Sequence, residues 1–524
     1  MDRNKHIYTI LFFLILFLGI VLRVYMLRNN LGTTLDSDEA IVGLMAKHIV
    51  TGKDYPIFYY GQNYMGSLEA FLAAGIFAIG GVSVFNLKLL MIILFCFFIV
   101  ITYYLAKSMT NKITALFSIL FLAIPPPFFA MYGLKARGGY METLIFGSLL
   151  LLLIVNYEKK MQSANGYLQI GLIAFIAGIA LWTDQLIIYY FLPVGIVLSH
   201  IFQKHFSFKR LIILFIFFIL GSLPQWVFTI IHSGYSLKGI PMIINAHNFM
   251  YSIRNFFFQG LPIILGARQA WSQTDFFSYA TIVTMSIYGS ALLYYLLVRK
   301  HIQEYQRRSF DLAILFLFTI PLIFSFSSKA HGFAQEPRYL MPIYSVITIF
   351  LGYFIVNLYT RVKYLSIALA IIIILINLVG IMRINPELQL PGVDGVRVNL
   401  NDSSFINFLE NKHLNAVYAD YWIAYRLDFE TNEGIIAVPW GENSMDRYPA
   451  YHGLIKSKSR YAIILAGTPV LYFEKYLSDK KIIYKNKVIG NYSIYYNFKR
   501  LNQIRNKDAY TKLKKVILDF HTFN

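Results

Sequence analysis

The chain has 524 residues, of which 57% are hydrophobic and 14% are charged, and its mean hydropathy is +0.55. These values exclude an ordinary soluble domain and indicate a polytopic α-helical membrane protein. The formal net charge of +20 would suit a nucleic-acid-binding protein. However, the Lys and Arg residues fall mostly in short loops between apolar runs and in the C-terminal tail, so membrane topology explains the charge better and we expect no nucleic-acid partner.

Apolar runs of spanning length follow one another along most of the chain. About eleven of them reach the ~20 residues that a helix needs to cross the hydrocarbon core. The first follows Arg3 and Lys5 and lacks a small-residue cleavage site, which indicates an uncleaved signal anchor. The runs lie at residues 7–27, 85–106, 113–131, 141–156, 167–183, 185–202, 211–231, 277–298, 310–327, 339–360 and 364–383.

Basic residues set the expected orientation. With a cytoplasmic N-terminus, alternate loops carry the Lys and Arg residues, as the positive-inside rule requires, and everything after Met382 lies outside. We therefore expect a multi-pass protein of a prokaryotic plasma membrane with an extracytoplasmic C-terminal domain. The segment 66–81 is interpreted as an interfacial helix; the alternative, a short span, would invert every later loop and stays open.

An acid cluster follows the first span. Asp36, Asp38 and Glu39 crowd into a few residues in a chain that is otherwise poor in charge. Such a cluster beside a membrane is costly unless it faces water, binds a cation or carries out proton chemistry, so it is a candidate active site. The alternative is structural: Asp36 or Ser37 caps a helix that begins near Asp38. Both roles can hold together.

Cations stand next to predicted membrane boundaries on the same side as the acid cluster. Their side chains can bind a lipid phosphate, Arg through paired hydrogen bonds. The alternative for each is snorkelling toward ordinary lipid headgroups. The cytoplasmic loops are short and merely basic, and the sequence contains no G-x-x-x-x-G-K-[ST] phosphate loop, which argues against a nucleotide site. The four cations are Lys135, Arg137, Lys329 and Arg338.

Other polar residues of the expected outer side have competing interpretations. Asp184 is a sugar-contacting residue or a solvated loop acid, and His331 is a substrate contact or a surface histidine. Tyr60 belongs to a stretch that is an interfacial aromatic belt or, secondarily, a sugar-stacking platform. Asp36 and Asp38 could hold a divalent cation, but no third ligand is evident, so the metal requirement stays open.

The composition changes after Pro391. Amphipathic stretches alternate there with short runs of β-branched and aromatic residues, which predicts a small α/β domain. We divide the chain into a membrane domain at 1–385, with a first external loop at 28–84, an outer α/β domain at 386–500 and a basic tail at 501–524. Helices are expected at 404–414, 449–458 and 470–479, and strands at 416–419, 434–438, 460–466, 481–489 and 492–496.

Two motifs resemble one family of membrane enzymes. Asp38-Glu39-Ala40, with Gly43, Gly52, Tyr60-Gly61 and Gly66-Ser67-Leu68 after it, resembles the first external loop of the GT-C glycosyltransferases, in their protein O-mannosyltransferase and aminoarabinose transferase branch. The segment Pro337-Arg338-Tyr339-Leu340-Met341-Pro342 is similar to the Arg-Tyr-Leu-x-Pro signature near the end of their membrane domain. The resemblance covers residues 1–385 by architecture. One departure is the absence of a Lys-Pro pair at Gln62 to Gly66, a role that Lys135 or Arg137 would take over.

The resemblance implies a hexosyl or pentosyl transferase of the cell envelope, active in glycosylation of protein or another acceptor. The donor would be a polyprenyl-phosphate sugar that enters from the bilayer, and the sugar would be transferred in one inverting step to a protein, lipid or glycan. Asp38 would be the general base and Glu39 its companion. Arg338, with Tyr339 beside it, would bind the lipid phosphate.

Two rival functions compete with this interpretation. A transporter or flippase of lipid-linked saccharides also needs many helices and a basic, aromatic cavity, and it would show broken or charged segments within its spans. A non-catalytic scaffold that presents the outer domain would leave the acid cluster without a role.

Overall fold

The computed structural model describes residues 3–160, 164–204, 206–232, 249–326, 337–393, 395–439, 446–456, 458 and 460–499. These residues form two compact units. Unit 1 comprises Met1–Thr33, Asn63–Glu69 and Lys88–Asn385, and unit 2 comprises Thr34–Gln62, Ala70–Leu87 and Pro386–Asn524. Unit 2 thus combines most of the first external loop with the C-terminal domain.

Unit 1 is a bundle of long apolar helices, and this confirms a polytopic helical membrane protein. In the described ranges, nine helices have the length and hydropathy of a span, or ten if one bent pair counts as a single span. The bent pair is α10 (Phe208–Gly221) and α11 (Leu223–Ile231), whose axes differ by 66°. The long helices are α1 (Arg3–Arg28), α4 (Val84–Met109), α7 (Tyr140–Lys160), α8 (Ala164–Thr183), α9 (Ile188–Lys204) with η1 (Gln185–Ile187) before it, α15 (Ala280–Val298), α16 (Glu304–Phe326), α17 (Tyr344–Tyr359) with η5 (Arg338–Ile343) before it, and α18 (Lys363–Met382).

The expected count of eleven spans is not confirmed. The run at 113–131 is interrupted, because three consecutive prolines at 125–127 remove backbone donors and end α5 (Lys112–Ala123) before α6 (Pro127–Tyr132) begins. Shorter helical segments of unit 1 are α13 (Phe249–Asn255), the π-helix η3 (Phe256–Gly260) and α14 (Leu261–Ile264).

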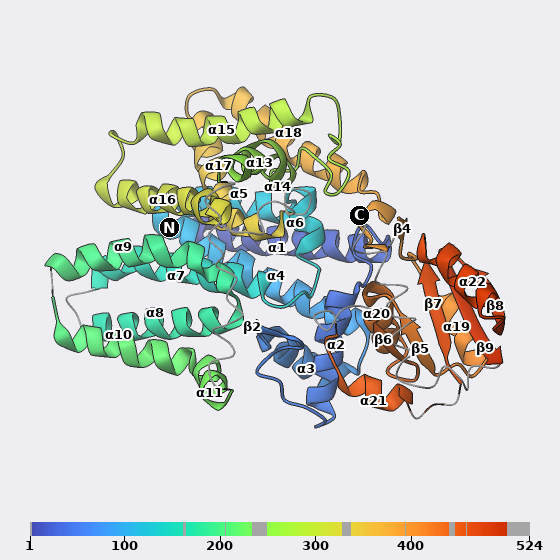
Figure 1. The fold of residues 1–524 in the computed structure, drawn as a ribbon. Helices are drawn as coiled ribbons and strands as arrows, with labels where there is room; N and C mark the ends of the chain where they lie inside the picture. Colours follow the sequence, from blue (N-terminus) through green and yellow to red (C-terminus); the bar gives the residue numbers. More distant parts are fainter. Residues whose placement is uncertain are drawn as a thin grey trace. The chain divides into compact units, whose positions relative to one another are not determined.

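Small residues allow the helices of unit 1 to approach closely. A Cβ atom added to Gly178 in α8 would overlap the carbonyl oxygen of Phe218 in α10, and one added to Gly221 would overlap the carbonyl oxygen of Phe175. Gly352 in α17 also lies too close to Ser118 in α5 to leave room for a Cβ atom. Figure 1 shows α8 and α10 side by side. Such close backbone packing is typical of helices in a bilayer.

The segment at 66–81 forms a helix, α3 (Leu68–Gly80), which has 13 residues. This is shorter than the ~20 residues of a full span. Its position on the membrane surface stays a prediction. Strand β2 (Gln62–Gly66) and helix α3 carry the chain from unit 2 through the Asn63–Glu69 segment of unit 1 and back.

The C-terminal part of unit 2 is the predicted α/β domain. Its five-stranded sheet has the order β6-β5-β7-β9-β8. Strands β6, β5 and β7 are parallel to one another, and β9 runs antiparallel to both of its neighbours, β7 and β8. The expected strands and helices agree with the observed ones to within a few residues, and α20 is an additional helix. The elements are β5 (Ala416–Ala419), β6 (Ile436–Pro439), β7 (Ala462–Ala466), β8 (Ile483–Ile489), β9 (Tyr492–Lys499), α19 (Ser403–Asn411), α20 (Tyr421–Glu430), α21 (Ala450–Lys456), α22 (Pro469–Asp479), η6 (Glu387–Gln389), β3 (Gly392–Val393) and β4 (Val396–Arg397).

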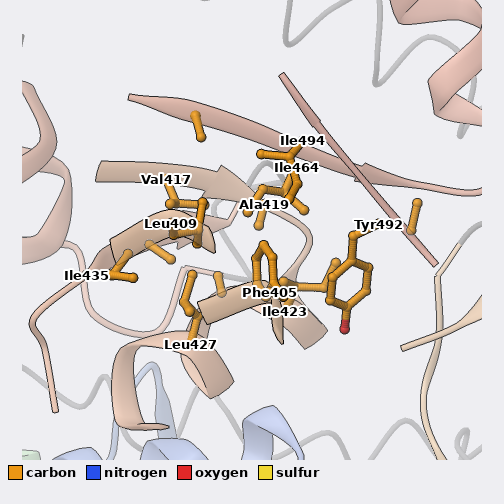
Figure 2. Close-up of a cluster of buried hydrophobic side chains, with 14 of the residues drawn as sticks. Phe405, Leu409, Val417, Ala419, Ile423, Leu427, Ile435, Ile464, Tyr492 and Ile494 are labelled. Carbon is orange, nitrogen blue, oxygen red and sulfur yellow. The ribbon is translucent and has the colours of Figure 1, made fainter. Parts of the chain in front are cut away.

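Apolar side chains fill both faces of this sheet. Because side chains alternate along a strand, Ile464 packs on one face with Phe405 of α19 and Ile423 of α20, as Figure 2 shows. Its neighbour Ile463 packs on the other face with Phe473 of α22. The sheet therefore lies between helices. The predicted tail at 501–524 lies outside the described residues.

The first external loop contributes α2 (Ser37–Val50) and β1 (Phe58–Tyr59) to unit 2. Gly43 of α2 lies against the ring of Phe429 in α20, at a distance that leaves no room for a Cβ atom. Phe429 also stacks on Phe77, with ring centroids 6.2 Å apart. The helix that carries the acid cluster is thus packed on the C-terminal domain.

Candidate active site

The acid cluster divides into two buried carboxylates and one that is partly exposed. Asp36 is the N-cap of α2, and its side chain accepts the backbone N–H of Glu39 at 3.2 Å. Asp36 is 1% exposed and Glu39 is fully buried, whereas Asp38 remains partly accessible. The capping interpretation is therefore confirmed for Asp36, and Asp38 is the carboxylate of this cluster that a substrate can reach.

Asp38 is held by two tyrosines from other parts of unit 2. The hydroxyl of Tyr421 donates to Asp38 Oδ1 at 2.6 Å, and the hydroxyl of Tyr59 donates to the backbone carbonyl of Asp38 at 2.9 Å. Ser37 Oγ donates to the backbone carbonyl of Tyr421 at 2.7 Å. The start of α2 is consequently fixed to the start of α20 through both side chain and backbone.

Arg447 supplies positive charge beside this acid. Its guanidinium lies 5.6 Å from the ring centroid of Tyr421 and donates to the carbonyl of Gly61 at 3.3 Å. Burial acts to lower the pKa of Arg447, but the neighbouring Tyr421, Tyr59 and Asp38 outweigh it and raise that pKa. The pKa of Tyr421 lies well above its ordinary value, chiefly because the side chain is buried and secondly because of the Asp38 charge. The Arg447 charge acts in the opposite direction. Tyr421 therefore stays protonated and Arg447 stays charged.

Tyr60 lies in a different cluster. Its hydroxyl donates to Asp54 Oδ2 at 2.9 Å and contacts His48 Nδ1 at 2.8 Å, and its ring lies 4.8 Å from that of Tyr448. Tyr60 is 7% exposed. The structure therefore places this side chain in an internal network.

That cluster, here named the Glu433 network, surrounds one carboxylate. The Glu433 side chain is bonded by Lys47 at 2.6 Å, Lys53 at 2.8 Å, His48 at 3.2 Å and Tyr451 at 2.9 Å. Burial acts to raise the pKa of Glu433, but hydrogen bonds from His48, Lys47 and Lys53 outweigh it and hold that pKa well below its ordinary value. The network joins the C-terminal end of α2 to the loop after α20.

Unit 1 gathers the predicted phosphate-binding residues of the described chain. The guanidinium of Arg338, at the start of η5, lies 5.5 Å from the ring centroid of Tyr339 and 5.9 Å from that of Tyr140. Tyr140 also interacts electrostatically with Arg137 and Asp184. Arg338, Tyr339, Arg137 and Asp184 are thus brought into one neighbourhood.

The loop before α7 carries two buried cations. Lys135 is 4% exposed and Arg137 is 6% exposed, and Arg137 donates to the hydroxyl of Tyr132 at 3.1 Å. Buried cations are costly in a membrane protein and usually mark a functional region. Snorkelling therefore does not describe these two residues, because a snorkelling side chain keeps its charge in water.

Glu69 orders this loop and was missed by the sequence analysis. Its carboxylate accepts the backbone N–H groups of Gly138 at 2.8 Å and Gly139 at 3.2 Å. Both glycines have positive φ angles, 82° and 96°, which other residues rarely adopt. Glu142, on the first turn of α7, is close enough to interact with Glu69. The available sequence signal was a lone acid within the apolar segment 66–81.

Asp184 has a local structural role. Its side chain accepts the backbone N–H of Leu186 at 2.9 Å and so caps η1, and its backbone pairs with that of Met65. Gly66 lies directly against the backbone of Trp182. The predicted substrate residues Lys329 and His331 lie outside the described residues.

The two residues suggested for a cation, Asp36 and Asp38, have protein hydrogen-bond partners. No group of three or more His, Cys, Asp or Glu residues that could hold a metal ion occurs in the described ranges. Asp36 is engaged in capping, and Asp38 Oδ1 accepts a proton donor rather than facing a third ligand.

Comparisons with known proteins bear on the fold. No family model and no curated protein matches the sequence. Among solved structures, ArnT from Cupriavidus metallidurans bound to undecaprenyl phosphate aligns at 10% identity and a TM-score of 0.60, over 96% of this chain and 99% of that chain.

Two structures of an archaeal enzyme are also similar. The Archaeoglobus fulgidus oligosaccharyltransferase in its apo form aligns at 10% identity over 89% of this chain and 70% of that chain, with a TM-score of 0.51. AglB of the same organism, in complex with an inhibitory peptide and a dolichol-phosphate, aligns at 10% identity over 96% and 75%, also with a TM-score of 0.51. The chain therefore shares its overall fold with these two enzymes.

Proposed function

We propose that the protein is an integral membrane glycosyltransferase that takes a sugar from a polyprenyl-phosphate donor and transfers it to an acceptor on the extracytoplasmic side. The observation that carries the proposal is the likeness to ArnT with undecaprenyl phosphate, which extends over almost the whole of both chains. A hexose or pentose donor and a protein, lipid or glycan acceptor all remain within the proposal.

The cations of unit 1 are assigned to the donor phosphate. Arg338 offers a guanidinium that can bind phosphate oxygens through paired hydrogen bonds, and the aromatic rings of Tyr140 and Tyr339 flank it. Arg137 and Lys135 add positive charge in the same unit. Positive groups aimed at the phosphate stabilise the negative charge that develops on it as the sugar leaves.

Asp38 of unit 2 is assigned the role of general base, with Glu39 as a buried companion on the same helix turn. Asp38 would accept the proton of the acceptor hydroxyl while the hydroxyl oxygen forms a bond to the anomeric carbon. The bond from that carbon to the phosphate oxygen breaks, and the polyprenyl phosphate leaves with the electron pair. A single displacement of this kind inverts the anomeric configuration.

The test is transfer by the purified chain in nanodiscs, supplied with a panel of radiolabelled undecaprenyl-phosphate sugars and with membrane extract as the acceptor source. Asp38→Asn should lower transfer by about 100-fold or more, because general-base catalysis contributes 10²–10⁴-fold. Arg338→Gln should weaken binding of undecaprenyl phosphate, measured by its thermal stabilisation of the protein.

Matched controls are Asp479→Asn and Arg361→Gln, which alter exposed residues. Both should behave as the unmodified chain does. Full transfer by Asp38→Asn would refute the base assignment, and unchanged undecaprenyl phosphate binding by Arg338→Gln would refute the phosphate assignment.

One observation favours a second function, a flippase for lipid-linked saccharides. The 66° bend between α10 and α11 is the kind of broken helix that transporters use. A flippase would move a fluorescent undecaprenyl-phosphate sugar across a proteoliposome membrane without releasing polyprenyl phosphate. Release that depends on Asp38 would favour the transferase.

A further inference from the structure

The candidate base is in contact with residues that lie far from it in the sequence. Tyr421 begins α20, and Arg447 precedes α21, and both belong to the C-terminal part of unit 2. Neither residue belongs to a motif that resembles the glycosyltransferases. Their positions around Asp38 therefore bear on what the C-terminal domain does.

Contacts on several sides hold Tyr421 in the position from which its hydroxyl reaches Asp38. Its backbone carbonyl is fixed by Ser37, and the N-terminus of α20 is capped by Asp420, which accepts the backbone N–H of Trp422 at 2.8 Å. Its ring makes an edge contact with that of Tyr425 at 5.5 Å. A donor whose position is already fixed loses little entropy in bonding a carboxylate, so its bond of 2.6 Å to Asp38 Oδ1 is available in every catalytic cycle.

Arg447 is anchored independently of the acid. Besides the carbonyl of Gly61, it bonds the side-chain oxygen of Gln62 at 2.8 Å when that amide is oriented to suit its surroundings. The guanidinium is thus fixed by the segment that follows β1. It acts on Asp38 through its charge.

The second oxygen of Asp38 is left open. Within the part of the chain that the structure describes, Asp38 Oδ2 accepts no hydrogen bond, and the side chain is partly exposed. A carboxylate with one oxygen fixed by a donor keeps its other oxygen available to accept the proton of a substrate hydroxyl.

We propose that Tyr421 and Arg447 are positioning residues for Asp38, so that the C-terminal α/β domain completes the catalytic acid site by fixing Asp38 Oδ1 and leaving Oδ2 for the acceptor hydroxyl. The inference rests on the proposed function. Asp38 receives the acceptor proton on Oδ2, and Tyr421 keeps its own proton throughout. Removing the Tyr421 hydroxyl withdraws a bond that favours the charged form of Asp38, and therefore raises the pH at which Asp38 becomes protonated.

Five charged or titratable groups are neighbours of Asp38 in sequence or in space and must be considered in any pH dependence. On its own helix these are Asp36 and Glu39, on β1 it is Tyr59, and from the C-terminal part they are Tyr421 and Arg447. In general a hydroxyl donor and a guanidinium stabilise a nearby carboxylate, and neighbouring acids destabilise it. Only Tyr421 and Arg447 are changed in the test below.

The test measures protonation of Asp38 without a sugar donor. Dicyclohexylcarbodiimide reacts with protonated carboxyl groups, so its attachment to the Asp38 peptide is followed by mass spectrometry from pH 3 to pH 9 in nanodiscs. In Tyr421→Phe the midpoint of labelling should rise by about one pH unit, since one unit corresponds to the usual strength of a hydrogen bond to a charged group. Arg447→Gln should raise it too, and Arg447→Lys should restore most of the original midpoint.

Tyr496→Phe is the control, because this β9 tyrosine packs against Phe408 in the same domain and away from the acid. It should leave the midpoint unchanged, and thermal unfolding of every variant checks that each one folds. If Tyr421→Phe and the unmodified chain have the same labelling midpoint, the inference is overturned. If Tyr421→Phe does not fold, the same conclusion follows when Arg447→Gln and the unmodified chain have the same midpoint.

Transfer activity separates the two proposals. With the donor found in the panel above, Tyr421→Phe should shift the acid limb of the pH–rate profile by the same amount as the labelling midpoint. A labelling shift together with full transfer by Asp38→Asn would refute the base role and with it any catalytic role for Tyr421. Loss of transfer in Asp38→Asn with no labelling shift in Tyr421→Phe would refute the positioning role alone.

Discussion

The two ends of α2 carry polar clusters of opposite character. At its N-terminal end Asp38 is partly exposed and bonded through one side-chain oxygen, and at its C-terminal end Glu433 is surrounded by Lys47, Lys53 and His48. A carboxylate enclosed by cations is fixed and inert, whereas one with an open oxygen is available for proton transfer. The difference suggests that charge density alone is a poor guide to a catalytic site, and that unsatisfied bonding capacity is a better one.

The largest difference between the two clusters is expected in how much each contributes to the stability of the protein. Glu433→Gln removes the charge that three basic side chains share, and should lower the free energy of unfolding of unit 2 by about 2–3 kcal/mol. Asp38→Asn, by contrast, should leave stability nearly unchanged. Thermal unfolding in nanodiscs measures both.

Glu410→Gln on the exposed face of α19 is the control for this pair. The carbodiimide labelling midpoint of Asp38 should stay the same in Glu433→Gln, since the network serves structure. If Glu433→Gln unfolds no more easily than Glu410→Gln, the two clusters do not differ in the way described.

Acid should weaken the Glu433 network specifically. The folded pKa of Glu433 lies below its ordinary value of 4.5, so its contribution is complete above that pH and is lost as the pH falls below it. Asp402 has the opposite sign, because burial raises its pKa to about 6 despite Arg426, so its carboxylate disfavours folding increasingly as the pH rises from 3.8 through 6.

Asp402 is present in both the unmodified chain and Glu433→Gln, so its contribution cancels when the unfolding midpoint of one is subtracted from that of the other. That difference in unfolding midpoint should be constant from pH 7 to about pH 5 and should shrink below pH 4.5. A difference that grows in acid would contradict the assigned direction.

A smaller effect is expected inside the network. Tyr60→Phe deletes the hydroxyl between His48 and Asp54 and should cost about 1 kcal/mol of stability, the usual net value of a hydrogen bond. Tyr55→Phe, in the same loop but 64% exposed, should cost nothing measurable. Transfer that falls far more than stability in Tyr60→Phe would instead indicate that the Tyr60 hydroxyl contacts the substrate.

The sequence predicted best what depends on neighbouring residues. Hydropathy identified most long helices of unit 1, and the alternation of amphipathic and β-branched stretches predicted the strands around Val417, Ile464 and Ile494. Hydropathy was less informative where prolines interrupt a helix. At Pro125 to Pro127 a continuous span was expected, but α5 ends and α6 begins there. Helix α20 went unpredicted, because its buried face includes polar residues such as Arg426 and Asp428.

Long-range partnerships were beyond local patterns. Asp38 stood out by its acidic neighbours and by its resemblance to known motifs, but its partner Tyr421 lies 383 residues away. Glu69 carried a weak signal as a lone acid in an apolar segment, and its two backbone partners near residue 138 carried none. Periodicity reports which face of an element is apolar, and does not report which element lies opposite.

The bond between Ser37 and the Tyr421 carbonyl spans 384 residues, and this has a consequence for biosynthesis. At 5–20 residues per second, a ribosome needs roughly 20–80 seconds to synthesise that much chain. During this interval the first loop lacks the strands and helices against which it finally packs. Truncation before Tyr421 would therefore leave α2 exposed to proteolysis.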